Sequence, residues 1–317
     1  MVLDGIFVLA GLLMLYFGAE WLVRGSASLA LRFGLSPLVV GLTVVAFGTS
    51  APELLVSIKA ALDQQAGMAV GNVIGSNIFN IAVVLGVAAL IKPMSIQFQL
   101  IRFDVPIMVG ACVLAAVFLR DGEISRFNGS VFVGLLVAYA AASVVVARKH
   151  GNAAVEAEFE NAVGTTGKSA WLDGAILTGG LIVLVLGAQL LVEGASGLAR
   201  GWGISEAVIG LTIVAAGTST PELAATIVAS LRGEADIAVG NVVGSTIYNV
   251  LCILGIASLI HPLDAQGVTS VDVGVMIGVC LLLVPFIRTG FTLRRWEGGI
   301  LLGIYAAYLG WLVSQVT

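Results

Sequence analysis

The chain has 317 residues and a formal net charge of −4 at pH 7; 59% of its residues are apolar and 11% are charged. A soluble domain carries about 25% charged residues, so this composition, with a mean hydropathy of +1.06, excludes an ordinary water-soluble domain. The sequence has no basic stripe, which argues against nucleic-acid binding. The three cysteines lie in apolar runs without metal-ligand spacing, which favours packed apolar side chains over a metal or redox centre.

Ten apolar runs along the chain are candidates to cross a bilayer, which takes about 20 residues of α-helix. They cover residues 3–23, 37–62, 67–91, 104–119, 127–147, 171–192, 206–231, 236–260, 271–287 and 296–315. The first run has no basic segment before it, so we interpret it as a retained span and not as a cleaved signal peptide. We predict an all-α polytopic membrane protein with ten transmembrane helices. It divides into a five-helix unit (1–147), a polar loop (148–170) and a second five-helix unit (171–317).

The distribution of Lys and Arg predicts the orientation of these spans. With the N-terminus outside, the inward segments hold 11 basic residues: Arg24, Arg32, Lys92, Arg102, Arg148, Lys149, Lys168, Arg232, Arg288, Arg294 and Arg295. The outward side holds 4: Lys59, Arg120, Arg126 and Arg200. Because Lys and Arg are enriched in cytoplasmic loops, we predict a multi-pass protein of the plasma (inner) membrane. The 148–170 loop is then cytoplasmic and both termini are outside.

Two motifs occur twice at the same separation. GLTVVAFGTSAPEL at 41–54 returns as GLTIVAAGTSTPEL at 210–223, with 11 of 14 positions identical. GNVIGSNIFN at 71–80 returns as GNVVGSTIYN at 240–249, with 7 of 10 identical, and both pairs are offset by 169 residues. Because each copy holds five spans, an odd number, the second copy should enter the membrane from the opposite side. Inverted repeats of this kind are characteristic of secondary transporters, whose sites lie near the membrane midplane.

The first motif places a proline and a glutamate in the middle of an apolar span. Pro52 has no N–H and its ring clashes with the carbonyl of Gly48, so the helix must kink or break there, as it must at Pro221. Carbonyls freed around Ala46 and Ala215 are tolerable in a membrane where they line a cavity or bind a cation. Each copy also presents one carboxylate and two hydroxyls on one helix face, namely Glu53, Thr49 and Ser50, and Glu222, Thr218 and Ser219. Such hard oxygen donors suit Na⁺ and Ca²⁺.

The second motif forms a polar stripe on an apolar helix. Its members recur every four residues: Asn72, Ser76 and Asn80 in the first copy, and Asn241, Ser245 and Asn249 in the second. Glycines at the same spacing allow a neighbouring helix to approach closely, so the stripe could face the broken segment and supply amide and hydroxyl oxygens. For Asn72 and Asn241, hydrogen bonding between helices is as consistent with the pattern as ion binding.

The acidic residues have alternative interpretations. Glu53 could form a structural ion pair with Lys59. A carboxylate at the bilayer centre costs roughly 2.5–3.5 kcal/mol on insertion scales, and its recurrence in two identical contexts favours a functional site instead. Glu20, near a span end, is expected to be solvated. Asp104 and Asp272, also at span ends, are expected at the membrane interface.

These motifs resemble the two α-repeats of the cation/Ca²⁺ exchanger superfamily, and most of all the compact prokaryotic sodium/calcium exchangers. The resemblance covers nearly the whole chain. It implies a core of spans 2, 3, 7 and 8, against which spans 1 and 6 slide during alternating access. The ion ligands that it implies are Glu53, Glu222, Thr49, Ser50, Thr218 and Ser219, the carbonyls of Ala46 and Ala215, and Ser76, Asn80, Ser245 and Asn249.

The function implied by this resemblance is secondary active antiport of Na⁺ against Ca²⁺, at three Na⁺ for one Ca²⁺. The resemblance therefore implies a protein that is not an enzyme and needs no cofactor. Its expected partners are the two ions and the lipid bilayer, with no obligatory protein partner. Some relatives, including potassium-dependent exchangers, carry Asp where Asn249 stands, so this chain offers two carboxylates and a potassium-dependent role is disfavoured. The alternative is H⁺-coupled exchange of Ca²⁺ or another divalent cation. A channel is disfavoured by the inverted repeat, and an intramembrane hydrolase by the lack of a catalytic motif.

Overall fold

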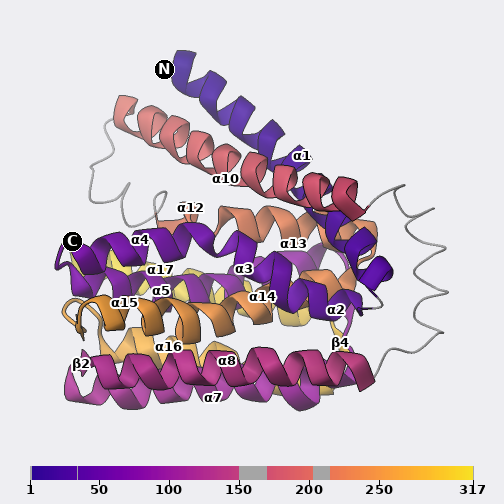
Figure 1. Ribbon diagram of the computed structural model, residues 1–317. Coiled ribbons are helices and arrows are strands. Elements are labelled where there is room, and N and C mark those ends of the chain that lie inside the picture. Colours follow the sequence, from indigo (N-terminus) through magenta and orange to yellow (C-terminus); the bar gives the residue numbers. More distant parts are fainter. Residues whose placement is uncertain (1, 34, 150–169, 203–214, 317) are drawn as a thin grey trace.

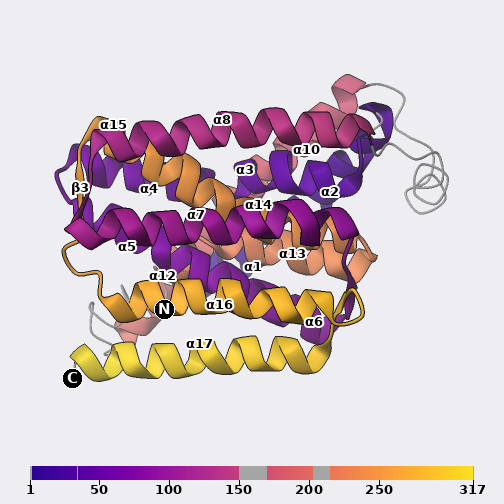
Figure 2. The ribbon, with the colours of Figure 1, turned by 90° about the horizontal axis from the view of Figure 1, so that it is seen from below.

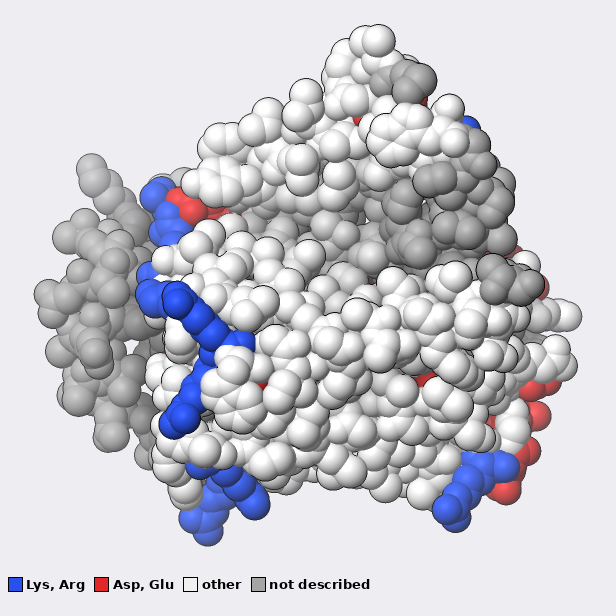
Figure 3. Space-filling model, turned by 180° about the vertical axis from the view of Figure 1, so that it is seen from behind, with Lys and Arg blue, Asp and Glu red and all other residues white. Residues whose placement is uncertain are grey.

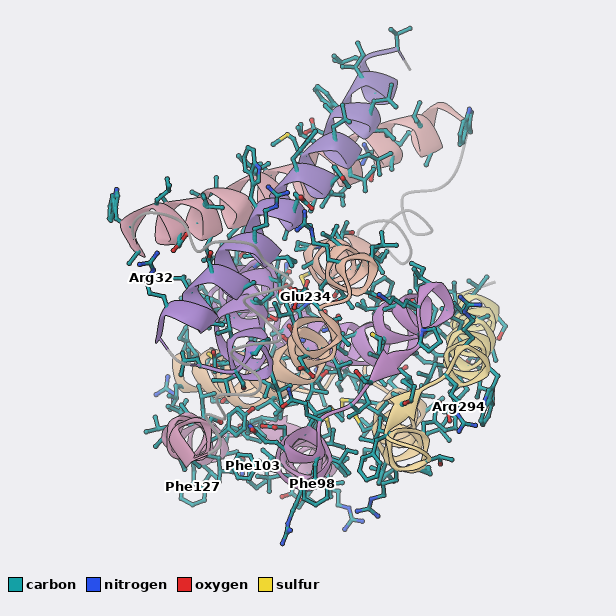
Figure 4. The ribbon with its side chains drawn as sticks, turned by 90° about the vertical axis from the view of Figure 1, so that its right-hand side faces the viewer. Arg32, Phe98, Phe103, Phe127, Glu234 and Arg294 are labelled. Atoms are coloured by element: carbon teal, nitrogen blue, oxygen red, sulfur yellow. The ribbon has the colours of Figure 1, made fainter. Side chains whose placement is uncertain are left out.

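The structure is a computed structural model that describes residues 2–33, 35–149, 170–202 and 215–316. Within these ranges it consists of helices, four two-residue strands and short connecting turns and loops. Most helices run alongside one another, whereas α1 (Val2–Phe33) and α10 (Ala170–Gly201) cover one side and cross the others at an angle (Figure 1). Viewed from one end, the other helices are seen nearly along their axes and α1 and α10 lie obliquely across them (Figure 4).

The remaining elements fall into two similar series. The first contains α2 (Pro37–Val40), the π-helical η1 (Gly41–Val45), α3 (Ala46–Thr49), α4 (Ala51–Leu62), α5 (Ala66–Phe79), the π-helical η2 (Asn80–Val84), α6 (Leu85–Ile91), β1 (Met94–Ser95), the π-helical η3 (Leu100–Asp104), α7 (Val105–Phe118), the 3₁₀-helical η4 (Leu119–Asp121), β2 (Glu123–Ile124) and α8 (Arg126–Lys149). The second contains α12 (Ala215–Gly217), α13 (Thr220–Arg232), α14 (Ala235–Tyr248), the π-helical η6 (Asn249–Leu254), α15 (Gly255–Ile260), β3 (Leu263–Asp264), α16 (Ser270–Arg288), β4 (Thr292–Leu293) and α17 (Arg295–Val316).

Seven helices of the described residues are long and apolar enough to cross a membrane, or eight if the bent pair 37–49 and 51–62 counts as one span. Each of the ten predicted runs coincides with a helix where it is described; residues 206–214 of the seventh run lie outside the described part. The first and sixth predicted runs end too early, because α1 and α10 are each 32 residues long. In α1 the helix continues through Arg24, whose charge is paired with Glu20 one turn earlier.

Glycines form the seam between α1 and α10. They recur every seven residues, at Gly11, Gly18 and Gly25 and at Gly180, Gly187 and Gly194. A Cβ atom at Gly18 would lie 2.6 Å from the Leu184 backbone nitrogen, and one at Gly187 would lie 2.9 Å from that of Leu15. The two backbones can approach this closely only because side chains are missing there. The seam therefore holds α1 and α10 together as one antiparallel pair.

The short strands connect the two copies reciprocally. Met94 in β1 is paired with Leu293 in β4, and Ile124 in β2 is paired with Leu263 in β3. A shift of 169 residues converts one pairing into the other. The β1–β4 and β2–β3 pairs lie at opposite ends of the helices; β2 and β4 mark these ends in Figure 1, and β3 marks the β2 end in Figure 2.

The turns after α4 and α13 provide a matched test of backbone strain. Gln64 has a φ of 58° and its counterpart Gly233 a φ of 85°. A left-handed conformation costs an L-residue about 1–2 kcal/mol. Glycine avoids this cost, but it loses more conformational entropy on folding than other residues, which offsets part of the gain. Gln64 is exposed and has little packing to lose. We expect Gln64→Gly to raise the free energy of unfolding by about 0.5–1 kcal/mol and Gly233→Gln to lower it by about as much. Equilibrium unfolding in detergent would measure both changes, and opposite signs would contradict the strain account.

One prediction about an acidic residue needs correction, and two other acidic residues have partners that the sequence did not indicate. Asp104 and Asp272, expected at the membrane interface, are buried within the protein, and each accepts a hydrogen bond from a tyrosine of the following long helix. The hydroxyl of Tyr139 lies 3.0 Å from Asp104 Oδ1, and that of Tyr308 lies 2.7 Å from Asp272 Oδ1. Glu20, expected to be solvated, has a side chain only 15% exposed and forms ion pairs with Arg24 and with Arg232 at the end of α13. The two arginines compensate the charge of Glu20, and the tyrosine hydroxyls each satisfy one oxygen of the two aspartates.

Charged side chains separate to the two ends of the molecule. In the view of Figure 3, Lys and Arg gather at the end that carries β4, Asp and Glu with fewer basic groups gather at the other, and the band between them is almost uncharged. The end with β4 includes Arg295, whose guanidinium donates to the Ile91 carbonyl. At the opposite end its counterpart Arg126 donates to the Ile260 carbonyl. This distribution is what a helical bundle with an apolar, lipid-facing middle requires.

Candidate cation-binding site

Both copies of the first motif lie where a helix breaks. In the first copy α3 ends at Thr49 and α4 begins at Ala51, and the segments Pro37–Thr49 and Ala51–Leu62 are bent by 45° at this break. Ser50, between them, has φ −82° and ψ 5°, and Ser219 at the equivalent break before α13 has φ −91° and ψ 8°. Pro52 lies in the first turn of α4, where its missing N–H removes no helical hydrogen bond. The break therefore occurs at the place that the proline predicts.

The two breaks meet through a reciprocal pair of hydrogen bonds. Ser50 Oγ donates to Glu222 Oε1 at 3.0 Å, and Ser219 Oγ donates to Glu53 Oε1 at 3.0 Å. Each hydroxyl thus binds the carboxylate of the other copy. Both glutamates are completely buried, whereas Lys59, the alternative partner considered for Glu53, is exposed. The fold brings residues about 170 positions apart in sequence into one buried polar cluster.

Several buried oxygens in and beside this cluster have no hydrogen-bond partner among the described residues. They are Glu53 Oε2, Glu222 Oε2, Thr218 Oγ1, Asn80 Oδ1 and Asn249 Oδ1. Leaving a buried polar group unpaired costs about 1–3 kcal/mol, and more for a charged one, so such groups are expected to have a ligand in the working protein. Carboxylate, hydroxyl and amide oxygens are the donors that Na⁺ and Ca²⁺ prefer. No cluster of three or more His, Cys, Asp or Glu occurs in the described part of the chain, so neutral oxygens would complete the coordination.

The helices of the second motif pack against the broken segments. Ser245 Oγ donates to the Ala46 carbonyl at 3.4 Å, and this carbonyl also accepts from Thr49 Oγ1 and from the Ser50 backbone N–H. Ala46 O is therefore already hydrogen-bonded in this structure. Ala215 is the first residue of α12; the residues before it lie outside the described part.

Two of the π-helical segments, η2 and η6, begin at the predicted amide ligands. η2 starts at Asn80 and η6 starts at Asn249. A π-bulge inserts one extra residue into a helical turn and is frequent at functional sites. Ser76, one turn before Asn80, is buried on α5. Asn80 and Asn249 are thus both buried at a local widening of the helix.

Asn72 and Asn241 act between helices. Asn72 Nδ2 donates to the Glu53 carbonyl at 3.2 Å and to Ser57 Oγ at 2.9 Å. Asn241 Nδ2 donates to the Glu222 carbonyl at 3.4 Å and to the hydroxyl of Thr226 at 3.0 Å. Asn241 Oδ1 also accepts from Thr49 Oγ1. These contacts fit the interhelical alternative and fix the backbone at each glutamate.

Three residues at or beside the site were not identified from the sequence: Ser57, Thr226 and Asn77, whose amide oxygen accepts from Asn249 Nδ2. Ser57 and Thr226 are equivalent positions one turn after each glutamate, so their recurrence as hydroxyls in an apolar helix was a usable signal. Asn77 has no such signal because its counterpart is Thr246.

Comparison with known proteins gives consistent matches over the whole chain. The family model described as "Sodium/calcium exchanger protein" matches residues 5–145 and 173–314. The putative antiporter CaxA of Alkalimonas amylolytica is 38% identical over 99% of this chain and 100% of its own length. The sodium/calcium exchanger MaX1 of Methanosarcina acetivorans is 35% identical over 95% of this chain and 96% of its own. A solved structure of the sodium-calcium exchanger NCX_Mj is similar with a TM-score of 0.84 and 34% identity, covering 98% of both chains.

Proposed function

The chain belongs to the sodium/calcium exchanger family, and from this premise we propose that it exchanges Na⁺ for Ca²⁺ across the membrane through one site shared by its two copies. The observation that carries the proposal is the reciprocal bonding of Ser50 to Glu222 and of Ser219 to Glu53. Because neither copy completes the cluster alone, two separate sites are disfavoured. The proposed core of the ligand set comprises the side chains that keep an oxygen without a partner among the described residues: Glu53, Glu222, Thr218, Asn80 and Asn249.

The remaining proposed ligands are Thr49, Ser50, Ser219, Ser76, Ser245 and the carbonyls of Ala46 and Ala215. Several of them form internal hydrogen bonds that an arriving cation would replace. Ser245 and Thr49 donate to the Ala46 carbonyl, and their release would leave that oxygen with only the hydrogen bond from the Ser50 backbone N–H. Because these oxygens can form either hydrogen bonds or ion contacts, the same cluster could bind Na⁺ and Ca²⁺ in turn.

Alternating access is proposed to follow from an inverted repeat. The reciprocal strand pairs at opposite ends of the helices support a two-fold relation with its axis in the membrane plane. The α1–α10 pair, held by its glycine seam, is the candidate for the part that moves against the bundle. The end rich in Lys and Arg is proposed to face the cytoplasm, which leaves both termini outside.

Reconstitution tests the coupling ion. We expect proteoliposomes preloaded with Na⁺ to accumulate external Ca²⁺, and matched liposomes preloaded with K⁺ not to do so. The reason is that the site has two carboxylates and several neutral oxygens, which suit Na⁺ as well as Ca²⁺. An outward proton gradient without Na⁺ should give no uptake. Uptake driven by that gradient alone would replace the proposal with H⁺-coupled exchange.

A further inference from the structure

Resting on the proposed function, we infer that Asn77 is a positioning residue: it holds the amide of Asn249 so that the oxygen, and not the nitrogen, is presented to the cation. Asn77 lies on α5 and Asn249 begins η6, so the contact joins the two copies. Asn249 Nδ2 donates to Asn77 Oδ1 at 3.0 Å, and both side chains are completely buried. The family-based ligand set does not include Asn77.

The hydrogen bond fixes which end of the amide is free. An asparagine amide has a donor end and an acceptor end, and only the oxygen can bind a cation. Because Asn77 occupies Nδ2, Oδ1 of Asn249 remains, and it has no hydrogen-bond partner among the described residues. Asn77 is itself oriented by its own Nδ2, which lies 3.8 Å from the Met276 sulfur on α16. Ser245, one turn before Asn249, contacts the Ala46 carbonyl, so this helix face is turned toward the first broken segment.

Within the described part of the chain, no equivalent hydrogen bond orients Asn80, the amide of the first copy. The counterpart of Asn77 is Thr246, whose Oγ1 donates to the Val242 carbonyl of its own helix at 2.9 Å. The amide of Asn80, the counterpart of Asn249, has both its nitrogen and its oxygen unpartnered among the described residues. One amide of the site is therefore held in place before the ion arrives, while the other is not. A fixed ligand loses less freedom on binding, so the two halves of the site are inequivalent toward cations.

Removing the partner that orients a metal ligand typically lowers metal affinity 10–100-fold. We therefore expect Asn77→Leu, which has a similar volume and no acceptor, to raise the half-saturating Ca²⁺ concentration of Na⁺-driven uptake roughly 10-fold. The maximum rate at saturating Ca²⁺ should change less than about twofold, because the ligands themselves remain. Thr246→Val is the matched control: it removes a buried hydroxyl at the equivalent position and should leave both parameters unchanged.

A double-mutant cycle separates positioning from general packing. In an Asn249→Ala background there is no amide to orient, so Asn77→Leu should no longer change half-saturation by more than about twofold, given that coupling appears only between interacting side chains. If Asn77→Leu does not fold, Asn77→Thr carries the same test, because threonine is the residue that the second copy accommodates at this position. Wild-type half-saturation in the folded Asn77 variants, or full additivity with Asn249→Ala, would overturn the inference. Failure of the wild-type protein to take up Ca²⁺ in exchange for Na⁺ would instead overturn the proposed function.

Discussion

Glu53→Gln and Glu222→Gln are each expected to lower Na⁺-driven Ca²⁺ uptake more than about 100-fold while leaving the protein folded. A divalent cation between two carboxylates loses half of its compensating charge when one becomes an amide. Removing one partner of a buried charge pair costs about 3–5 kcal/mol, and each 1.4 kcal/mol corresponds to a tenfold change in binding. The amide retains an oxygen that can accept from Ser219 or Ser50, so the hydrogen bonds between the copies can persist.

The chain offers a close control for these variants. Glu297 is a completely buried glutamate on α17 that accepts a hydrogen bond from the Arg294 backbone N–H. In the first copy the equivalent pair is Asn128 and Ser125, with an amide oxygen as acceptor. Glu297→Gln therefore removes a buried carboxylate outside the site and should keep near wild-type uptake. Na⁺-driven Ca²⁺ uptake into proteoliposomes compares the three glutamine variants, and equilibrium unfolding in detergent checks that each of them is folded. Wild-type uptake by either site variant would refute the shared site.

Membrane potential is expected to change the final Ca²⁺ gradient roughly 50-fold per 100 mV. The proposed site would carry about −2 from Glu53 and Glu222, because Asn80 and Asn249 are neutral. One Ca²⁺ would cancel this charge, whereas three Na⁺, the stoichiometry implied by the resemblance, would leave about +1, so that one net charge would cross the membrane in each cycle. Moving one charge through the field is worth roughly 2.3 kcal/mol per 100 mV, which at 1.4 kcal/mol per tenfold gives this ratio. An inside-negative potential should therefore speed Na⁺-driven Ca²⁺ extrusion and slow the reverse.

Liposomes clamped with valinomycin and K⁺ test this directly. The Na⁺ gradient is kept constant, the potential is set to either polarity or to zero, and the final Ca²⁺ distribution is measured. Equal final gradients at both polarities would indicate two Na⁺ per Ca²⁺, because the loaded site would then be neutral in both directions. That result would leave the antiport proposal standing and remove the three-sodium stoichiometry.

Local sequence determined much of what could be predicted about this fold. Every predicted apolar run corresponds to a helix where it is described, and the break at Pro52 follows from the missing N–H. The duplication predicted that equivalent residues would have equivalent surroundings, and Ser50 with Glu222 and Ser219 with Glu53 have them. Periodicity identifies which residues share a helix face, and both motifs depend on that.

The sequence could not show which faces of distant helices pack against each other. The tyrosines that bind Asp104 and Asp272 are 35 and 36 residues away, and Arg232 is 212 residues from Glu20. No local pattern connects such partners, so the sequence predicts none of these three contacts. Asn77 could not be predicted for a different reason. The duplication identifies positions that recur in both copies, whereas the proposed role of Asn77 depends on a difference between the copies.

The most direct test of the shared site is the number of Ca²⁺ ions that the purified protein binds without Na⁺. Equilibrium dialysis should give one Ca²⁺ per wild-type chain. At a concentration that saturates the wild type, Glu53→Gln and Glu222→Gln should each bind none, and Glu297→Gln should bind one. Two Ca²⁺ per wild-type chain, with one retained by each site variant, would mean that each copy has its own site and would contradict this account.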